Sequence, residues 1–369
     1  MRLLMNAVTA GPHAPGNWTH LYNLLRGWDA AATDDRILLA AHPSFPRETE
    51  AAFSGLVDVR RAREGRLGVL FAQHVGLAGM ARRFDVDAVL NTTPVAATLV
   101  SVRRPQVTIV HDLRHAVHPE EFSRSEAYYR RLVYHRSIRR SDAVVAISES
   151  TRDHVVRELH LAPQDVAVVA LGADHVDQWA RGVGGSHAVT FAHWSNKRPE
   201  LAVRAWAILR SGIPGFATRL EVVGVPPGAR IGLESLARRF ALEGLVRLHG
   251  RLPDAEYQRM FTGASVVLLP TSLEGFGLPV IEAQRLGIPV VASAGVGIEA
   301  AGGAAAVYAP GDAESFASEC RRLFTDDAWR RLVVARGVEH ASAYTWKATA
   351  LATRRIIMEA VRARETGNE

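Results

Sequence analysis

The sequence predicts an α/β protein built from two doubly wound domains in tandem. Short apolar runs alternate along the chain with longer periodic segments that are rich in arginine and alanine. The apolar runs are continuous rather than alternating in polarity, as expected for parallel strands that are covered on both faces. The chain has 369 residues, which exceeds the ~250–300 residues at which a single hydrophobic core stops growing.

The first domain is expected to span residues 1–182. Helices are predicted at 17–27, 123–140 and 149–159, between apolar runs that we interpret as buried strands. Those runs are, in order, RLLMNAV, RILLA, DAVLN, QVTIV, DAVVAI and DVAVVA. Strands that alternate with helices in this way are typical of a parallel sheet with helices on both faces.

The second domain, predicted at 183–342, follows the glycine-rich segment ARGVGGSHA, which is the best linker candidate in the chain. Its expected strands are AVTFA, RLEVV, LVRLHG, SVVLL and PVVAS. Helices are predicted at 197–211, near 230–242 and after Pro279. A long amphipathic helix within 343–369 need not belong to the second sheet, and we expect it to cross back to the first domain.

The composition excludes several classes of protein. The charged fraction of 22% and the apolar fraction of 48% are ordinary for a soluble globular protein. A single cysteine, Cys320, excludes an intramolecular disulfide framework. No run approaches the ~18 apolar residues of a membrane span, and the first residues lack the pattern of a signal peptide. We therefore expect a cytoplasmic protein.

The net charge of +6 gathers partly in the segments RRARE and YYRRLVYHRSIRR. The simpler interpretation is solvated helix faces, and the alternative is a surface that meets acidic lipid or an anionic substrate. No basic tract is interleaved with aromatic residues as in nucleic-acid-binding modules, so no nucleic-acid partner is expected. Only two of the 44 basic residues are lysines, Lys197 and Lys347, a bias that indicates a GC-rich genome.

Unusual residues follow several of the predicted strands. Open parallel sheets bind ligands beyond the carboxyl ends of their strands, so these positions are candidates for a site. They are Gly16, Asn17, His111 and Asp112 in the first domain, and Lys197 and Glu274 in the second. A cleft between the two domains could collect all of them.

The segment LLPTSLEGFGLPVIEAQRLGIPVVAS places Glu274 and Glu282 on either side of a glycine-rich turn. Pro279 suits the first turn of a helix that would run to about Leu286. Gly275 and the glycine at 277 leave the backbone bare, so the N–H groups at the helix start form a site for an anion such as phosphate.

The two glutamates have several interpretations. Glu282 could be a helix-dipole residue, worth ~0.3–1 kcal/mol. The pair could also serve a glycosidase, or a metal, although no His or Asp ligands lie near. A carboxylate beside a phosphate site is repelled unless it accepts O–H donors from a neutral part of the ligand. A ligand with phosphates in the middle and a hydroxylated ring on each side would fit both glutamates. A nucleotide sugar has this structure, and it is the ligand that we favour.

The segment EGFGLPVIEA resembles the E-x7-E motif of retaining glycosyltransferases of the GT-B fold, in glycosyltransferase family 4. The segments VTIVHDL, SDAVVAISESTRDHV, VALGAD, GNWTHLYNLL and HGRLPDAEYQRMFTGASVVLL are similar to the family pattern too, so the resemblance covers nearly the whole chain. It implies two Rossmann-like parallel-sheet domains that face each other across a cleft.

The resemblance implies a division of roles. Glu274 would hold hydroxyls of the transferred sugar, and Glu282 would hold the ribose hydroxyls of the nucleotide. The catalytic residues would be His111, Glu274 and Lys197. Donor binding would involve Gly16, Arg198, Leu252, Phe276, Gly277, Leu278 and Glu282. The candidate acceptor-binding residues are Asn17, Asp112 and Arg114.

The resemblance also implies a retaining transfer in which neither glutamate is a nucleophile and a phosphate oxygen takes the acceptor proton. No metal and no cofactor are expected. The partners would be a nucleotide diphosphate sugar and a glycan, lipid-linked or natural-product acceptor, with peripheral contact to a membrane as one alternative.

One departure from the family pattern concerns the stretch VTFAHWSNKRPE, where Phe191, Ala192 and Asn196 stand at places that usually hold a Gly and an Arg. Arg198 follows Lys197 and is the candidate for the second cation. Two alternatives therefore stay open: a non-catalytic or weak nucleotide-sugar-binding protein, and a sugar-nucleotide epimerase. A phosphorylase would need a lysine for pyridoxal phosphate, and Lys347 is a poor candidate.

Overall fold

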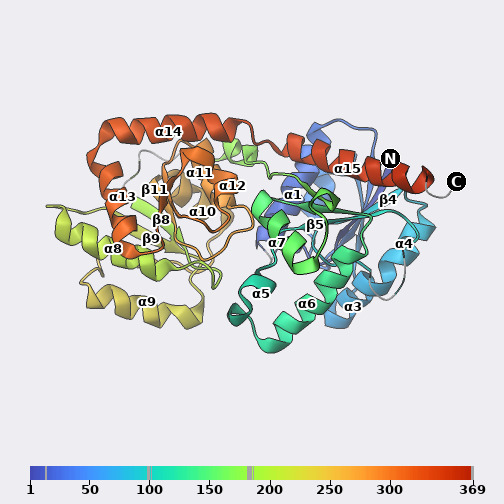
Figure 1. Cartoon of the computed structure of the whole chain (residues 1–369), viewed down its shortest axis with the longest axis horizontal. Helices are drawn as coiled ribbons and strands as arrows, with labels where there is room; N and C mark the ends of the chain where they lie inside the picture. Colours follow the sequence, from blue (N-terminus) through green and yellow to red (C-terminus); the bar gives the residue numbers. More distant parts are fainter. Residues whose placement is uncertain (13–14, 98–99, 101, 181–184, 186, 367–369) are drawn as a thin grey trace. The chain divides into compact units, whose positions relative to one another are not determined.

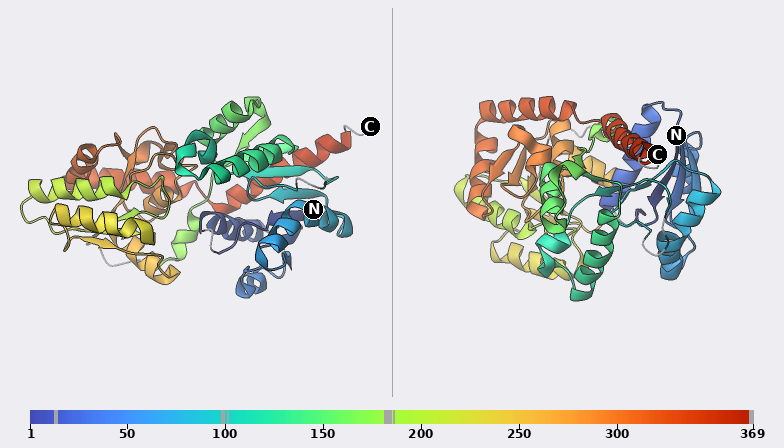
Figure 2. Two further views of the ribbon diagram at one scale, coloured as in Figure 1. Left: turned by 90° about the horizontal axis from the view of Figure 1, so that it is seen from below. Right: turned by 45° about the vertical axis from the view of Figure 1, so that its right-hand side comes forward.

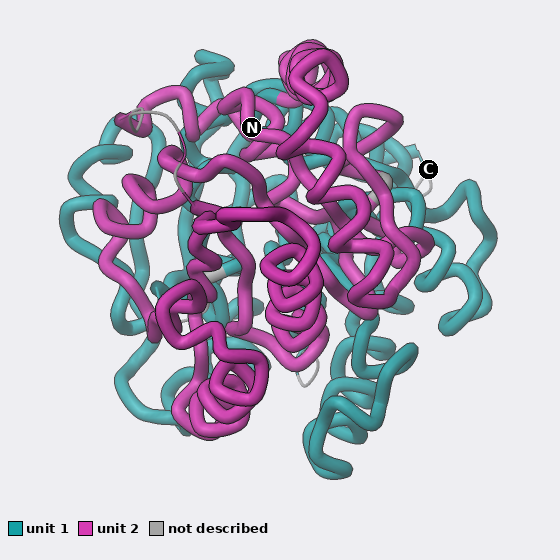
Figure 3. Tube along the Cα trace, turned by 90° about the vertical axis from the view of Figure 1, so that its left-hand side faces the viewer, with its two compact units in different colours: residues 1–172, 345–369 teal, residues 173–344 magenta. Residues whose placement is uncertain are grey.

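The chain forms two compact units, coloured separately in Figure 3. In this computed structural model the described residues are 1–366, except 13–14, 98–99, 101, 181–184 and 186. Unit 1 comprises Met1–Gly172 together with Thr345–Glu369, and unit 2 comprises Ala173–Tyr344. The two parallel sheets confirm the predicted fold class.

Unit 1 is built on a seven-stranded parallel sheet with the strand order β3-β2-β1-β4-β5-β6-β7. Figure 1 labels two of its strands, β4 and β5. The order reverses between β1 and β4, which creates a switch point where loops diverge beyond the carboxyl edge. The strands are β1 (Arg2–Ala7), β2 (Arg36–Ala41), β3 (Val57–Arg61), β4 (Ala88–Asn91), β5 (Gln106–Val110), β6 (Ala143–Ala146) and β7 (Val166–Val168).

Helices flank this sheet, and two of them begin at serine caps. Ser123 Oγ accepts from Glu126 N at the start of α6, and Ser148 Oγ accepts from Thr151 N at the start of α7. The helical elements are α1 (Pro15–Ala30), α2 (Arg47–Ala52), α3 (Gly65–Phe71), η1 (Ala72–Gly76), α4 (Leu77–Arg83), α5 (Arg114–Val117), η2 (Pro119–Glu121), α6 (Arg124–Arg139), α7 (Glu149–Leu159), η3 (Pro163–Asp165) and α15 (Trp346–Thr366).

The last helix, α15, completes unit 1 by packing along α1 (Figures 1 and 2). Its buried residues recur every three or four positions, from Trp346 to Ala360, as an amphipathic helix requires. The packing is close: a Cβ at Gly27 would lie 2.1 Å from the Trp346 carbonyl oxygen, so no larger residue fits there. Buried Asp35 joins the two ends of the unit by accepting from Arg354 Nε at 2.7 Å.

Unit 2 is built on a six-stranded parallel sheet with the order β10-β9-β8-β11-β12-β13. The strands are β8 (His187–Phe191), β9 (Arg219–Val223), β10 (Val246–Leu248), β11 (Ala264–Leu269), β12 (Val290–Ser293) and β13 (Val307–Ala309). The helical elements are η4 (Asp174–Gln178), α8 (Pro199–Gly212), α9 (Pro227–Arg239), α10 (Asp254–Thr262), α11 (Leu278–Arg285), α12 (Glu299–Gly302), η5 (Gly303–Ala305), α13 (Ala313–Thr325) and α14 (Asp327–Ser342).

The first boundary lies earlier than the predicted position between 182 and 183, which falls among residues that the structure does not describe. The chain passes into unit 2 at Ala173, because η4 is bonded to α11. His175 Nε2 lies 3.0 Å from Glu282 Oε1, and Arg285 Nε donates to Asp177 Oδ1 at 2.7 Å. The second boundary falls at Thr345 rather than at 343.

Two edge strands, β3 and β13, were not predicted. β3 alternates in burial and contains two arginines, because it lies at the edge of its sheet. β13 is only three residues long, too short for a recognisable pattern. Among the helices that the structure describes, none has the length and apolar character needed to cross a bilayer.

Candidate functional site

The candidate site in unit 2 begins where two neighbouring strands, β8 and β11, end. The loops that follow them are joined by backbone hydrogen bonds: Arg198 N donates to Pro270 O at 2.9 Å, and Ser272 N donates to Asn196 O at 3.0 Å. Lys197 and Thr271 face each other across this antiparallel bridge. Lys197 therefore meets Glu274, although 77 positions separate them in the chain.

Glu274 is the centre of a buried polar cluster. Its Oε1 accepts a hydrogen bond from Lys197 Nζ, and it lies 2.9 Å from Thr271 Oγ1 and 3.2 Å from Asn196 Nδ2. Lys197 is 6% exposed and the Glu274 side chain 11% exposed, so the two charges are largely removed from water and compensate each other. Within the described chain, none of the recorded hydrogen bonds reaches Glu274 Oε2, which stays available to accept from a ligand hydroxyl.

Asn196 is the residue at which the sequence departs from the family pattern, and it has a defined structural role. Its Nδ2 lies 2.8 Å from Leu273 O and 3.1 Å from Thr271 Oγ1, in addition to its contact with Glu274. It is 4% exposed. The amide therefore holds the loop that carries Glu274, a role that sequence reasoning did not assign.

Helix α11 begins directly after the glycine-rich turn, at Leu278, with Pro279 as its second residue. Gly277 precedes it at φ +99°, a conformation that L side chains rarely adopt. A Cβ there would also lie 2.9 Å from Ile298 Cγ1. The ring of Phe276 is buried and lies 6.2 Å from that of Tyr344, so this residue can offer a ligand only its backbone. In this first turn Pro279 has no N–H and Val280 N donates to Gly277 O at 2.9 Å, so Leu278 supplies the N–H group that an anion would meet.

Glu282 is the fifth residue of α11, which starts at Leu278, so it lies beyond the first helical turn. The helix-dipole interpretation is therefore wrong, since that effect falls off within the first turn. The Glu282 side chain is buried and its Oε1 lies 3.0 Å from His175 Nε2, which leaves Oε2 for a further donor. Burial, and then the nearby Glu282 carboxylate, raise the pKa of Tyr257 well above its usual value.

His175, Trp179 and Tyr257 around Glu282 were missed by sequence reasoning. The ring of Trp179 lies 5.7 Å from that of His175 and 5.8 Å from that of Tyr257, so the three side chains form one wall beside the glutamate. A signal was present for His175, because it follows the family-like segment VALGAD directly.

Two further donor-binding candidates in unit 2 are Arg198 and Leu252. Arg198 caps the start of α8, and its exposed side chain pairs with Glu200 at 3.7 Å. The Arg198 guanidinium lies close to Gly311, which follows β13: its Nη1 is 3.7 Å from the place where a Cβ at residue 311 would stand. Of Lys197 and Arg198, therefore, only Lys197 forms an ion pair with Glu274 in the part of the chain that the structure describes. Leu252 is half-buried in the loop after β10.

In unit 1, His111 lies at the carboxyl end of β5, and its Nε2 is 2.9 Å from Thr92 O. A carbonyl only accepts, so Nε2 carries the hydrogen and Nδ1 of the neutral ring is an acceptor. Burial lowers the pKa of His111, and burial followed by the charge of His111 lowers the pKa of His20. The two rings lie edge to face at 4.6 Å. Both rings are therefore neutral at pH 7.

Two of the three acceptor-binding candidates, Asp112 and Arg114, contact each other. Asp112 Oδ1 accepts from Arg114 N at 3.0 Å, and Arg114 Nε lies 3.3 Å from Glu121 Oε2 with its guanidinium over the Phe122 ring. These contacts give the Arg114 side chain a structural role in the loop before α6. The third acceptor-binding candidate, Asn17, lies in the first turn of α1 beside the donor-binding candidate Gly16, which is exposed.

The comparisons with known proteins agree with this arrangement. A family model described as Glycosyltransferase Family 4 matches residues 16–177, and one described as Glycosyl transferases group 1 matches residues 186–326. The chain is 27% identical over 262 residues to the O-antigen chain mannosyltransferase B of Escherichia coli, covering 65% of this chain and 67% of that protein. It is 33% identical over 162 residues to the D-inositol 3-phosphate glycosyltransferase of Thermobifida fusca, covering 42% of this chain and 37% of that protein.

Solved structures share the fold over nearly the whole chain. HepE of Anabaena, solved in complex with UDP and glucose, has a TM-score of 0.72 at 16% identity and covers 97% of this chain and 100% of its own. Sucrose-phosphate synthase of Thermosynechococcus elongatus has a TM-score of 0.74 at 19% identity, with 98% and 100% covered. The matches to many of the curated relatives span only about a third to two thirds of those proteins. The two family models and the shared fold together place the chain among the family 4-like glycosyltransferases of the GT-B fold, and it belongs to that family.

Proposed function

We propose that the chain transfers a sugar from a nucleoside diphosphate sugar to an acceptor hydroxyl, with retention of anomeric configuration and without a metal. The observation that carries the proposal is the buried cluster around Lys197 and Glu274 at the carboxyl ends of β8 and β11. Relatives support it, since one is a mannosyltransferase and a protein of the same fold was solved with UDP-glucose.

Glu274 would act as an acceptor for the sugar rather than as an acid or a nucleophile. Lys197, Thr271 and Asn196 all approach Oε1, which fixes the orientation of the carboxylate. Oε2 would then accept from a hydroxyl of the transferred sugar. Glu282, held in the same way by His175 through Oε1, would accept from the ribose.

The positive charge that the leaving diphosphate needs would come from Lys197 and the start of α11. An ammonium has three N–H donors, and Glu274 engages one of them. The others would meet a phosphate oxygen, together with the N–H group of Leu278 at the start of α11. Negative charge on the diphosphate grows as the glycosidic bond breaks, so fixed donors at this position favour the transition state over the ground state.

The chemical step would then need no protein base. The acceptor oxygen forms its bond to the anomeric carbon on the face that the nucleotide leaves, and a phosphate oxygen takes the acceptor proton. The products are the glycosylated acceptor and a nucleoside diphosphate. His111 would accept a substrate hydroxyl at Nδ1, the ring nitrogen that does not contact Thr92 O.

The test incubates the full chain with a panel of nucleotide sugars, with and without acceptors, and measures nucleoside diphosphate release in the presence of EDTA. The anomeric configuration of the product is read by NMR. We expect acceptor-dependent release that Lys197→Met lowers by roughly 100- to 1,000-fold, as for the loss of other transition-state donors. Glu234→Gln, which changes a partly exposed glutamate of α9 in the same unit, is the control and should retain activity.

The alternatives predict different results. Donor binding without release of the nucleoside diphosphate under any condition would support a non-catalytic binding protein. The asparagine at 196 favours this alternative, because the family pattern usually has an arginine near this place. Conversion of the nucleotide sugar to an epimer without an acceptor would support an epimerase. An inverted product would contradict the retaining step.

A further inference from the structure

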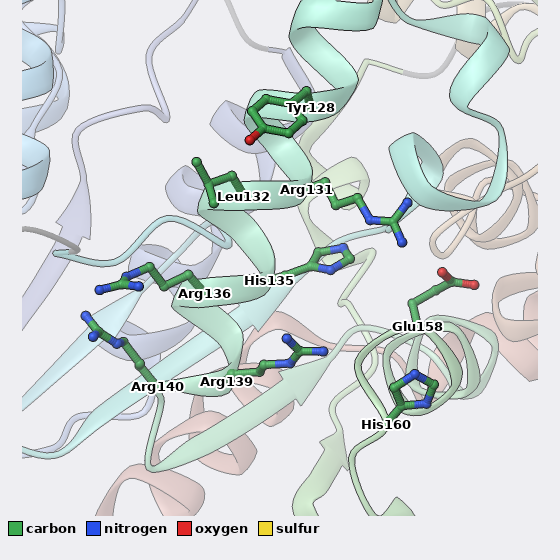
Figure 4. A pocket seen from close by; sticks show the side chains of 9 residues that line it. All are labelled: Tyr128, Arg131, Leu132, His135, Arg136, Arg139, Arg140, Glu158 and His160. Carbon is green, nitrogen blue, oxygen red and sulfur yellow. The ribbon is translucent and has the colours of Figure 1, made fainter.

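A groove between α6 and α7 of unit 1 lies outside the site described above (Figure 4). Its volume is about 600 Å³. The lining residues come from one face of α6 and its end, and from the end of α7: Tyr128, Arg131, Leu132, His135, Arg136, Arg139, Arg140, Glu158 and His160. What the groove binds does not depend on the proposed transfer reaction, because no residue of that reaction lines it.

The groove is strongly basic. Four arginines line it against one carboxylate, that of Glu158, which already lies 3.6 Å from Arg157. Within the described chain, no ion pair joins Arg131 or Arg136 to a carboxylate, whereas Arg130 on the same helix pairs with Glu126 at 2.8 Å. The charges of Arg131 and Arg136 are therefore not paired with a carboxylate among the described residues.

His135 adds a buried polar atom to this charge. The residue is 8% exposed, and its Nε2 is buried without a hydrogen-bond partner. Figure 4 shows its ring directed to the same side of α6 as Arg131 and Arg139, which stand one turn before and after it. A phosphate oxygen at this position would satisfy the ring nitrogen and accept from the two guanidinium groups at once.

The rim of the groove is apolar. Tyr128 is 71% exposed and Leu132 is 56% exposed, and both lie on the stripe of α6 that continues to Arg136. A soluble anion would gain nothing from these side chains. A lipid bilayer would, because its phosphates meet the arginines while its acyl boundary takes up exposed leucine and tyrosine.

We propose that the α6–α7 groove is a docking surface for a bilayer of anionic phospholipid. Headgroup phosphates contact His135 and the arginines at 131, 136 and 139, and the side chains of Tyr128 and Leu132 enter the boundary between headgroups and acyl chains. The contact is peripheral and reversible, since it rests on a few charges and a small apolar area.

The chain contains a matched control for this surface. Helix α14 of unit 2 carries the segment RRLVVAR, close to the segment RRLVYHR of α6, so Arg331, Leu332 and Arg336 repeat the spacing of Arg131, Leu132 and Arg136. These α14 side chains are also exposed. α14 has alanine where α6 has the buried His135, and its residues line neither of the described cavities.

The experiment measures co-sedimentation of the full chain with vesicles of phosphatidylcholine alone and of phosphatidylcholine mixed with phosphatidylglycerol, at low and high salt. We expect binding to the anionic vesicles only, weakened by salt. Arg131→Gln/Arg136→Gln should weaken it roughly 25-fold, because each arginine near an anionic bilayer strengthens binding about fivefold. Arg331→Gln/Arg336→Gln should change it less than about twofold.

Leu132→Ser should weaken binding at high salt more than Leu332→Ser does, because only the first would remove inserted apolar surface. The proposal is overturned if the chain does not sediment with anionic vesicles at low salt, or if the α14 variants lose as much binding as the α6 variants. Binding of glycerol phosphate that Arg131→Gln/Arg136→Gln abolishes, without vesicle binding, would also overturn it in favour of a soluble ligand. Donor binding in unit 2 should be unchanged in the α6 variants, which separates this outcome from a failure of the proposed reaction.

Discussion

Removal of the Lys197 ammonium should destabilise the chain, and removal of the glutamate charge with it should restore stability without restoring activity. Lys197→Met keeps most of the side-chain volume but leaves the buried Glu274 carboxylate without its counter-ion. Breaking a buried pair in this way costs roughly 3–5 kcal/mol. Thr271 and Asn196 still approach Oε1, so we expect the lower end of that range, about 3 kcal/mol.

The double variant Lys197→Met/Glu274→Gln removes both charges and keeps an oxygen for Thr271 and Asn196. Its stability should return to within ~1 kcal/mol of the wild type, since neutral replacement of a buried pair is often without cost. Urea unfolding followed by tryptophan fluorescence measures the three free energies. Sugar transfer should be lost in both variants, because the ammonium and the acceptor carboxylate are both needed.

Two results would refute this reasoning. One is a Lys197→Met variant as stable as the wild type, which would mean that water or a rearranged side chain already compensates Glu274. The other is a double variant less stable than the single one, which would mean that the pair contributes packing rather than charge compensation.

Further predictions concern the Glu282 carboxylate, the glycine turn before α11 and a buried histidine of unit 1. Glu282→Ala should weaken binding of the free nucleoside diphosphate about tenfold or more in calorimetry, and His175→Phe should weaken it to a smaller degree. Glu274→Ala should leave that affinity unchanged, and equal losses for the two glutamates would contradict the division of roles. Gly277→Ala should weaken donor binding and lower the melting temperature, because it combines a positive φ with a contact to Ile298; an unchanged melting temperature would show that the turn can adapt. Burial lowers the pKa of His115 to about 4 in the folded chain, so between pH 6.5 and 4 the unfolded state binds a proton that the folded state does not. The free energy of unfolding should therefore fall by up to ~2–3 kcal/mol as the pH falls from about 6.5 to 4. His115→Phe should flatten that pH profile, and an unchanged slope would exclude this histidine as the cause.

The sequence predicted the strand-end positions of the site better than the contacts within it. Lys197 and Glu274 could be placed at the ends of strands because continuous apolar runs precede each of them. Their ion pair could not be predicted, because it depends on β8 lying next to β11 rather than only next to β9. That neighbour relation is a property of the whole sheet and has no local pattern.

His175 illustrates a second limit of sequence reasoning. The expected linker at 180–188 assigned His175 to the first domain, away from Glu282. In the structure the boundary lies before η4, so this histidine belongs to the unit that contains its partner. The basic segment on α6 shows a third limit, since only the helical faces reveal which arginines are paired and which line the groove.

The return of α15 to unit 1 has a consequence for synthesis of the chain on the ribosome. Unit 2 is a continuous stretch inserted into unit 1, so its sheet can fold as soon as residue 344 has left the exit tunnel. Unit 1 has all its strands much earlier, but the face of α1 that meets Trp346 stays uncovered until residues 346–366 are made. A truncation at the end of unit 2 would therefore leave unit 1 incomplete, and unit 1 could be produced alone only with α15 joined to Gly172 by a new linker.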